Sequence, residues 1–235
     1  MERRNAKPKR ELVMPGDVLD ESGARAGEYA YVRDGKVYAA VLGIKNVSQL
    51  GVGVIPLHGQ YMPSAGDLVI GIINDIGSSN WMVDIKAPYP APLHVSEVPW
   101  KVEFGDTSRF LNIGNVVLLK VLSVDESKKI QVTMNDSGLR RLEGGLLVEV
   151  SHTKVSRIIG KSGSMIQTLK GLSDCRIFVG QNGRIWIDGD EDRAVVVAQA
   201  IKMIEENAQA RDLTNKVKVF LENNLPAEED EDEED

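Results

Sequence analysis

Cysteine, histidine and long hydrophobic runs are all scarce in this sequence of 235 residues. Its single cysteine, Cys175, excludes an internal disulfide framework and favours a reducing, cytoplasmic compartment. One cysteine and three separated histidines do not supply the ligand spacing of a zinc site. No apolar run approaches the roughly 20 residues that a membrane-spanning helix needs. We therefore expect no bound metal, no cofactor and no membrane contact.

Catalytic motifs are missing as well. The sequence has no H-E-x-x-H or H-x-x-E-H pair and no nucleophile elbow. Its dense carboxylates are the eight acidic residues at 228–235, which lack the fixed scaffold that two-metal chemistry demands. Because like charges repel and cannot build a core, residues 227–235 are predicted to be a disordered acidic tail. We expect a protein that is not an enzyme, and a nuclease is the least favoured interpretation.

The stretch "RIIGKSGSMI" at residues 157–166 raises the question of phosphate binding. A P-loop requires G-x-x-x-x-G-K-[ST], because its glycines let backbone N–H groups surround the phosphates of a nucleotide. Val155 occupies the position of the first glycine, so the P-loop interpretation fails. The same residues contain G-x-x-G, in which two glycines let the backbone approach a sugar–phosphate chain without a Cβ atom in the way. The segment therefore predicts a grip on a nucleic-acid backbone.

Three segments follow one another along the chain. Residues 1–60 hold short β-rich runs, and "RDGK" between two of them signals a hairpin, so we predict a small β domain. Residues 63–136 predict five strands with one longer connection, the pattern of an OB-fold barrel. Residues 144–210 change to the order β-α-α-β-β-α, and residues 211–226 predict one more helix. The expected fold class is multidomain α+β.

The third segment resembles a type I KH domain, in which a G-x-x-G loop clamps four backbone nucleotides. The helix after the loop would offer unpaired N–H groups to a phosphate, and basic side chains would add charge. Four isoleucines, Ile158, Ile159, Ile166 and Ile177, are candidates for the floor of a base-binding groove, although at least half must be core. The predicted RNA-binding residues of this domain are Arg157, Ile159, Gly160, Lys161, Ser162, Gly163 and Ile166.

The second segment resembles an S1-type OB fold, which binds single-stranded RNA. In that family, an aromatic residue on the second strand and a histidine before a Ser-Glu pair lie on the nucleic-acid face. The matching positions are Trp81 and His94. A base stacked on such a ring is worth about 1–3 kcal/mol. Packing in the barrel is an equally good interpretation of Trp81, and the sequence leaves the choice open.

The order of a β domain, an S1 domain and a KH domain resembles the RNA-binding cap subunit of the archaeal exosome, of the ribosomal-RNA-processing-protein-four type. The resemblance covers nearly all of residues 1–225. Its most specific local feature is "GQNGRIWI", similar to a G-x-N-G-x-I-W signature of such subunits. The residues that carry this signature are Gly180, Asn182, Gly183, Ile185 and Trp186.

This resemblance implies a non-catalytic subunit for RNA degradation and processing. In the family, three copies form a cap on a ring of RNase PH-like subunits, sometimes mixed with a zinc-ribbon cap subunit. The N-terminal domain docks on the ring, and the subunit captures single-stranded, often A-rich RNA and threads its 3′ end toward the ring. The alternative is a free-standing S1/KH regulator of translation or rRNA maturation. A docking domain should present a sizeable apolar patch, whereas a free regulator should not.

Overall fold

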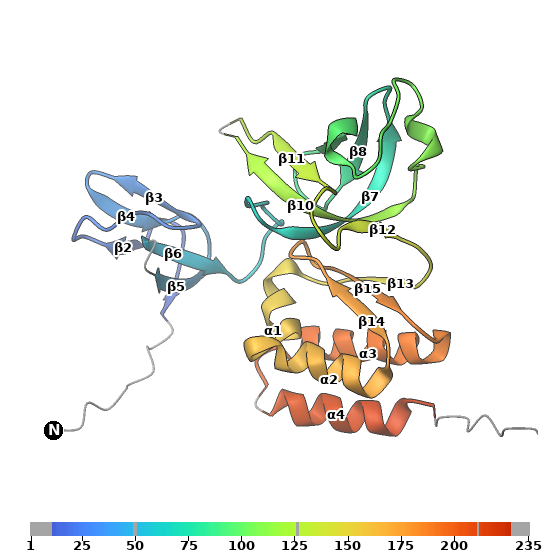
Figure 1. Ribbon diagram of the computed structural model, residues 1–235. Coiled ribbons are helices and arrows are strands. Elements are labelled where there is room, and N and C mark those ends of the chain that lie inside the picture. The colour runs from blue at the N-terminus through green and yellow to red at the C-terminus, as the bar shows by residue number, and fades with distance from the viewer. Residues whose placement is uncertain (1–10, 49–50, 126, 211, 227–235) are drawn as a thin grey trace, which may run out of the picture. The chain divides into compact units, whose positions relative to one another are not determined.

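The computed structural model describes residues 11–48, 51–125, 127–210 and 212–226, and the chain divides into two compact units (Figure 1). Unit 1 comprises residues 1–59 and unit 2 comprises residues 60–235. The predicted acidic tail lies outside the described residues.

Unit 1 is the small β domain that the sequence predicts. One sheet has the order β1-β5-β6 and the other has the order β2-β4-β3. The strands are β1 (Leu12–Val13), β2 (Val18–Asp20), β3 (Ala30–Arg33), β4 (Lys36–Ala39), β5 (Gly43–Ser48) and β6 (Gly51–Pro56). Strands β3 and β4 form the predicted hairpin, and both turn residues, Asp34 and Gly35, have positive φ, as a type I′ turn requires. Inward-facing residues of the two sheets make a core that includes Leu19, Val37 and Val54.

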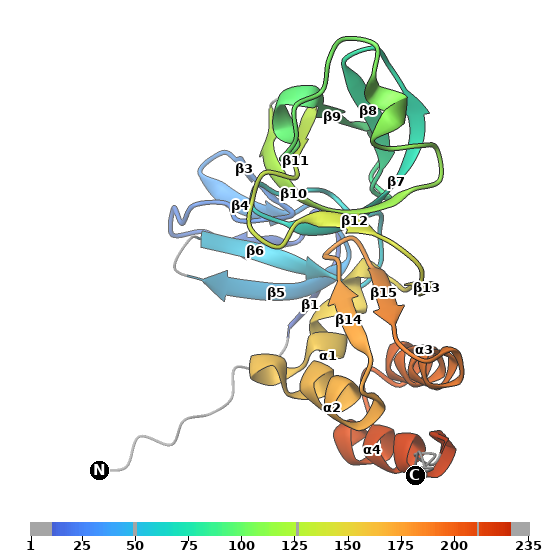
Figure 2. The same cartoon turned by 45° about the vertical axis from the view of Figure 1, so that its right-hand side comes forward.

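The first part of unit 2 is a closed five-stranded barrel, which confirms the predicted OB fold (Figure 2). Its strands run in the order β11-β9-β8-β7-β10, and β10 pairs with β11 to close the ring. Their bounds are β7 (Leu68–Ile76), β8 (Asn80–Asp84), β9 (Ala91–His94), β10 (Val116–Val124) and β11 (Ile130–Thr133). A short strand that the sequence did not predict, β12 (Arg140–Leu142), pairs with the start of β10.

The second part of unit 2 has the β-α-α-β-β-α order of a KH domain, as predicted. Its elements are β13 (Leu146–Glu149), α1 (Val155–Ile159), α2 (Ser164–Ser173), β14 (Arg176–Val179), β15 (Arg184–Asp188) and α3 (Glu191–Glu206), followed by α4 (Leu213–Asn224). The antiparallel sheet has the order β13-β15-β14, and the helices cover one of its faces. Asp190 caps α3 by accepting a hydrogen bond from the Arg193 backbone N–H at 3.0 Å. Cys175 is buried in this core, and burial raises the pKa of its thiol.

Candidate nucleic-acid interface

The G-x-x-G loop joins α1 to α2 in a backbone conformation that needs glycine. Gly160 has φ 78° and ψ 173°, a region open essentially to glycine alone, and Gly163 is left-handed with φ 80°. A Cβ atom on Gly160 would lie 2.7 Å from the Met165 backbone nitrogen, so this glycine is required for packing as well. A Cβ atom on Gly163 would meet nothing closer than 3.9 Å. Gly163 therefore borders open space, where a backbone ligand can approach.

Two of the predicted basic and polar groups project from this loop. Lys161 and Ser162 are both exposed beside the start of α2. Arg157 is held differently, because its guanidinium donates to the Ala210 carbonyl at 3.1 Å and its Nε atom is buried. Arg157 thus ties α1 to the segment before α4, and Lys161 is the freer cation for a phosphate. These RNA-binding roles remain predictions.

The four candidate isoleucines divide between the core and the surface. Ile158 and Ile177 are buried, at 0% and 3% exposure, and belong to the KH core. Ile159 and Ile166 are half-buried at the edge of that core, on either side of the G-x-x-G loop. Only the second pair can offer apolar surface to a nucleotide base.

The barrel decides the role of Trp81 in favour of packing. Its ring is 0% exposed and its Nε1 donates to the Leu111 carbonyl at 3.2 Å, so it cannot stack on a base. His94 is exposed at the end of β9, where its Nδ1 lies 2.8 Å from the Ser96 hydroxyl. The two predicted S1 site residues therefore do not form one surface, and His94 alone remains a candidate contact.

The signature residues lie where the barrel meets the KH domain. Asn182 is 1% exposed, and its Nδ2 donates to the Ile70 and Ile85 carbonyls of the barrel at 2.8 and 3.0 Å. Its Oδ1 accepts from the Ile70 N–H at 3.3 Å. A Cβ atom on Gly180 would lie 2.9 Å from the same N–H, so the glycine permits this close approach. Trp186 packs against barrel residues in a small shared core, and Ile185 belongs to the KH core.

A buried arginine adds further contacts between the barrel and the KH domain, and we call this contact region the joint. Arg184 is 3% exposed, and its guanidinium binds Asp84 at 2.5 Å and Glu149 at 2.9 Å. The hydrogen bond from Arg184 lowers the pKa of Glu149, with a further contribution from Lys86. Burial alone would raise the pKa of Asp84, but hydrogen bonds from Arg184 and the Lys86 backbone outweigh it and lower that pKa. The joint is therefore a satisfied polar network that fixes the KH domain on the barrel.

Sequence reasoning missed this network. Arg184 and Asp84 are 100 positions apart, and each is an unremarkable strand residue in its own segment. The signal in the sequence that could have indicated this network is "GQNG". There the polar Asn182 lies between Gly180 and Gly183, two residues that permit another backbone to approach closely.

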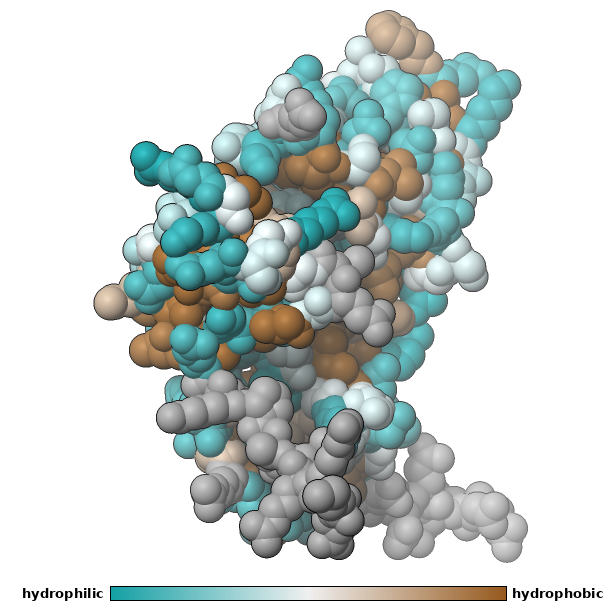
Figure 3. Space-filling model, turned by 90° about the vertical axis from the view of Figure 1, so that its left-hand side faces the viewer, coloured by the Kyte–Doolittle hydropathy of each residue, from teal (hydrophilic) through white to brown (hydrophobic). Residues whose placement is uncertain are grey.

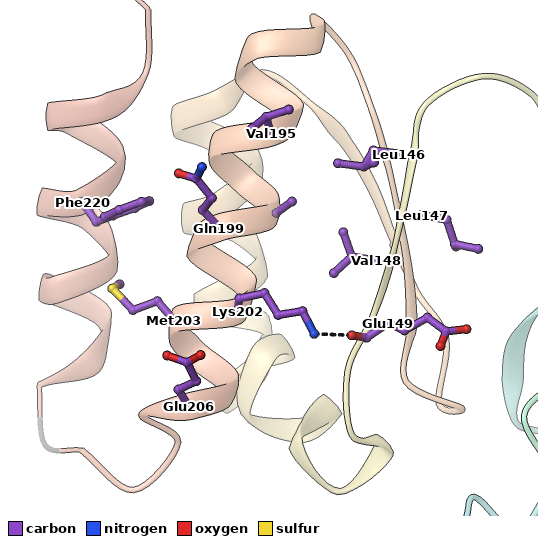
Figure 4. A pocket seen from close by; sticks show the side chains of 11 residues that line it. Leu146, Leu147, Val148, Glu149, Val195, Gln199, Lys202, Met203, Glu206 and Phe220 are labelled. Atoms are coloured by element: carbon purple, nitrogen blue, oxygen red, sulfur yellow. Dashed lines mark hydrogen bonds between the residues drawn. The ribbon is translucent and has the colours of Figure 1, made fainter.

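A cavity of about 770 Å³ opens beside β13, an edge strand of the KH sheet, between β13, α3 and α4 (Figure 4). Its lining is mostly apolar and includes Leu146, Val195 and Phe220. Lys202 reaches across it to donate to the Glu149 carbonyl at 2.5 Å and also binds Glu205. No residue of the G-x-x-G loop lines this cavity, and Lys202 is engaged by Glu149 and Glu205.

Within the described ranges, no cluster of three or more His, Cys, Asp or Glu residues could hold a metal ion. In the same part of the chain, none of the helices is long and apolar enough to span a bilayer.

Comparisons with known proteins agree with this domain order. A model of the exosome RNA-binding protein RRP4 N-terminal domain matches residues 10–58, a model of the RRP4 S1 domain matches residues 60–107, and a KH-domain model matches residues 145–193.

Whole-length relatives share the order too. Exosome complex component Rrp4 of Methanosarcina acetivorans is 45% identical over 214 residues, 91% of this chain and 82% of that protein. The Thermoplasma volcanium protein of the same name is 42% identical and covers 90% of both chains. A crystal structure described as an exosome complex RNA-binding protein aligns with TM-score 0.66 and 38% identity, over 71% of this chain and 97% of the other. The predicted family is thus confirmed: this chain belongs to the Rrp4 family.

Proposed function

We propose that this protein is the RNA-capturing cap subunit of an exosome. Its S1 and KH domains bind RNA and are not catalytic, and its relatives are exosome components. The observation that carries the proposal is the G-x-x-G loop, where Gly163 borders open space beside exposed Lys161. The loop would hold the backbone of single-stranded, often A-rich RNA, and the subunit would thread the 3′ end toward a degradative ring.

Unit 1 supplies a surface suited to docking on ring subunits of the RNase PH type. Leu12, Ile44 and Ile55 are paired side by side across β1, β5 and β6, and this aliphatic row faces outward. Leu12 is 62% exposed and Ile55 is 51% exposed. Hydrophobic residues gather in patches on the surface of this unit (Figure 3). Contiguous exposed apolar surface of this kind is typical of a protein–protein interface.

Three copies around one pore would complete the cap, alone or mixed with a zinc-ribbon subunit. A single G-x-x-G loop gives weak, salt-sensitive affinity, and several linked loops raise the effective concentration of binding sites. A cytoplasmic location is part of the proposal, because the lone, buried Cys175 suits a reducing compartment.

Substitution of Gly163 by Asp tests the RNA-binding loop. A carboxylate there would repel the phosphate chain, and we expect at least a roughly tenfold loss of affinity for oligo(A), measured by fluorescence anisotropy. Two variants serve as controls: Gly171→Asp adds the same charge inside α2 at a position with open space, and Gly163→Asn imposes the same left-handed backbone on a side chain without the carboxylate. Gly160→Asp is less suitable, because its Cβ would collide with Met165 and destabilise the domain. Equal affinities of wild type and Gly163→Asp would place the RNA elsewhere.

Pull-down of the tagged protein from nuclease-treated host lysate separates the proposal from its alternative. Recovery of RNase PH-like subunits in near-equal amounts is the expected result. Recovery of ribosomal proteins alone would favour a free-standing S1/KH regulator of translation or rRNA maturation.

A further inference from the structure

We propose that Phe104 of the barrel is an RNA contact, and that its ligand is one base of single-stranded RNA stacked on the phenyl ring. This inference rests on the proposed function and deepens it, because it gives the barrel the aromatic surface that the buried Trp81 cannot supply. Together with the exposed His94, Phe104 would form an RNA site in addition to that of the KH loop.

Phe104 is the most exposed large hydrophobic side chain in the part of the chain that the structure describes, at 84%. It lies in the connection between β9 and β10, residues 95–115. Two other aromatic residues of this connection, Trp100 and Phe110, stack on each other at 5.8 Å between centroids and pack against the barrel core. Among the described residues, Phe104 belongs to no hydrophobic cluster, so the packing of the fold does not require its ring.

The backbone holds Phe104 at a fixed place on the surface. The Asp106 N–H donates to the Glu103 carbonyl at 3.0 Å, and Gly105 has φ 89°, as the third position of a type II turn requires. Phe104 therefore occupies the second position, at a corner of the turn. The Gly105 N–H donates to the Ser78 carbonyl at 3.0 Å, which ties this turn to the connection between β7 and β8. Because the backbone is already ordered, less conformational entropy is lost when a base stacks on the ring.

The connection between β7 and β8 also holds the segment that follows His94. The Val95 N–H donates to the Ser79 carbonyl at 3.0 Å, and Ser79 is the next residue after Ser78. Two consecutive carbonyls of one short turn thus bind the segments that carry His94 and Phe104. The two exposed rings therefore lie at the same end of the barrel.

His94 belongs to the outer face of β8 and β9. Alternation along β8 puts Trp81 inside the barrel and Met82 outside, and Met82 is opposite Pro92 of β9. His94 is two positions after Pro92 and therefore shares this outer face. The second and third strands are the face with which OB folds bind oligonucleotides. An RNA strand that lies on this face and continues past His94 would reach Phe104 at the end of the barrel.

The surroundings of Phe104 favour stacking over charge. Residues 101–109 carry two basic and two acidic side chains, which are Lys101, Arg109, Glu103 and Asp106. Of these, Arg109 binds Asp106 at 2.9 Å. Release of counterions makes phosphate contacts sensitive to salt, whereas a base stacked on an uncharged ring releases none. A stacking role for Phe104 therefore predicts an effect on affinity without an effect on its salt dependence.

The experiment measures the affinity of the full chain for a fluorescent oligo(A) of roughly 12 nucleotides, a length within the range of OB-fold sites. We expect Phe104→Ser to weaken binding roughly 5- to 100-fold, as the loss of one stacked base implies, with an unchanged slope of log K against log salt. Phe104→Trp keeps an aromatic face and should bind at least as tightly as wild type. Phe104→Leu keeps apolar surface but has no aromatic face, so its affinity should resemble that of Phe104→Ser.

Ile113→Ser provides a matched control. Ile113 is 64% exposed in the same connection, so this substitution removes exposed apolar surface without removing an aromatic ring. Its affinity and salt slope should both match wild type. Because both positions are exposed, thermal melting should be unchanged in every variant, which checks that the fold is intact.

Three results would overturn the inference. Phe104→Ser could bind as wild type does, Phe104→Leu could retain wild-type affinity, or Phe104→Ser and Ile113→Ser could lose equal affinity. Loss of ring subunits from a pull-down with Phe104→Ser, at unchanged oligo(A) affinity, would assign Phe104 to a protein contact instead. Absence of oligo(A) binding by the wild-type chain would contradict the proposed function, so the two failures are distinguishable.

Discussion

At the scale of single residues, burial shows which predicted site residues can contact RNA and which can only stabilise the fold. Trp81 and His94 occupy positions with the same expected role, yet one ring is fully enclosed and the other is exposed. The indole N–H of Trp81 is satisfied by a carbonyl inside the barrel, so its loss would cost stability rather than a base contact. Asn182 and Trp186 are also buried, and these two signature residues stabilise the contact between the barrel and the KH domain.

His152 makes the stability of unit 2 depend on pH. Its ring packs edge-on against Tyr61, its Nε2 is buried, and burial followed by the charge of Lys86 lowers its pKa below 6.5. The unfolded chain therefore binds a proton before the folded one does. Stability is fully present above pH of about 6.5 and is lost as the pH falls through the folded pKa.

We expect the free energy of unfolding in urea to fall between pH of about 7.5 and 5.5, and to fall less in His152→Gln. Asp84 and Glu149 do not contribute to this change in stability, because their lowered pKa values leave both carboxylates charged over the same pH range. An identical dependence in wild type and His152→Gln would show that His152 is not the titrating group.

At the scale of elements, local signals were predictable from sequence and distant pairings were not. The Asp34-Gly35 turn, the G-x-x-G loop and the period of α3 each lie within one short window, where backbone sterics or helical spacing determine the outcome. Strand β12 has only three residues and no alternation long enough to detect. It is defined by its pairing with the start of β10, which lies in a different part of the sequence, so no local pattern could reveal it.

A substitution in the loop between β14 and β15 tests how the KH domain is held on the barrel. Asn182→Ala removes the hydrogen bonds of the Ile70 N–H and the Ile85 carbonyl to this side chain, at about 1–3 kcal/mol for each buried group, while the Ile70 carbonyl keeps its 3.4 Å bond from Arg184. We expect urea unfolding to show a loss of at least about 2 kcal/mol, with barrel and KH domain melting in separate steps. Asn135→Ala, which loses a comparable amide–carbonyl bond at the surface, should change little. A single unshifted transition in Asn182→Ala would mean that the joint is held without this side chain.

At the scale of the whole molecule, the two units present different surfaces. Unit 2 joins two RNA-binding domains, the barrel and the KH domain, through a buried network around Arg184. Unit 1 has its own core and an outward aliphatic row, and it carries no G-x-x-G loop. Recognition of RNA and attachment to a ring should therefore be separable by mutation.

Ile55→Asp tests that separation. The substitution places a carboxylate within the aliphatic row at a position 51% exposed, so folding of unit 1 should survive. Burying that charge against a ring subunit would be costly, and we expect at least a roughly tenfold loss of ring binding in pull-down. Val32→Asp is the control, an apolar residue 57% exposed on the other sheet of the same unit. Oligo(A) affinity of the isolated chain should be unchanged in both variants. If Ile55→Asp still recovers the ring while Val32→Asp does not, the docking surface is the β2-β4-β3 sheet and not the aliphatic row.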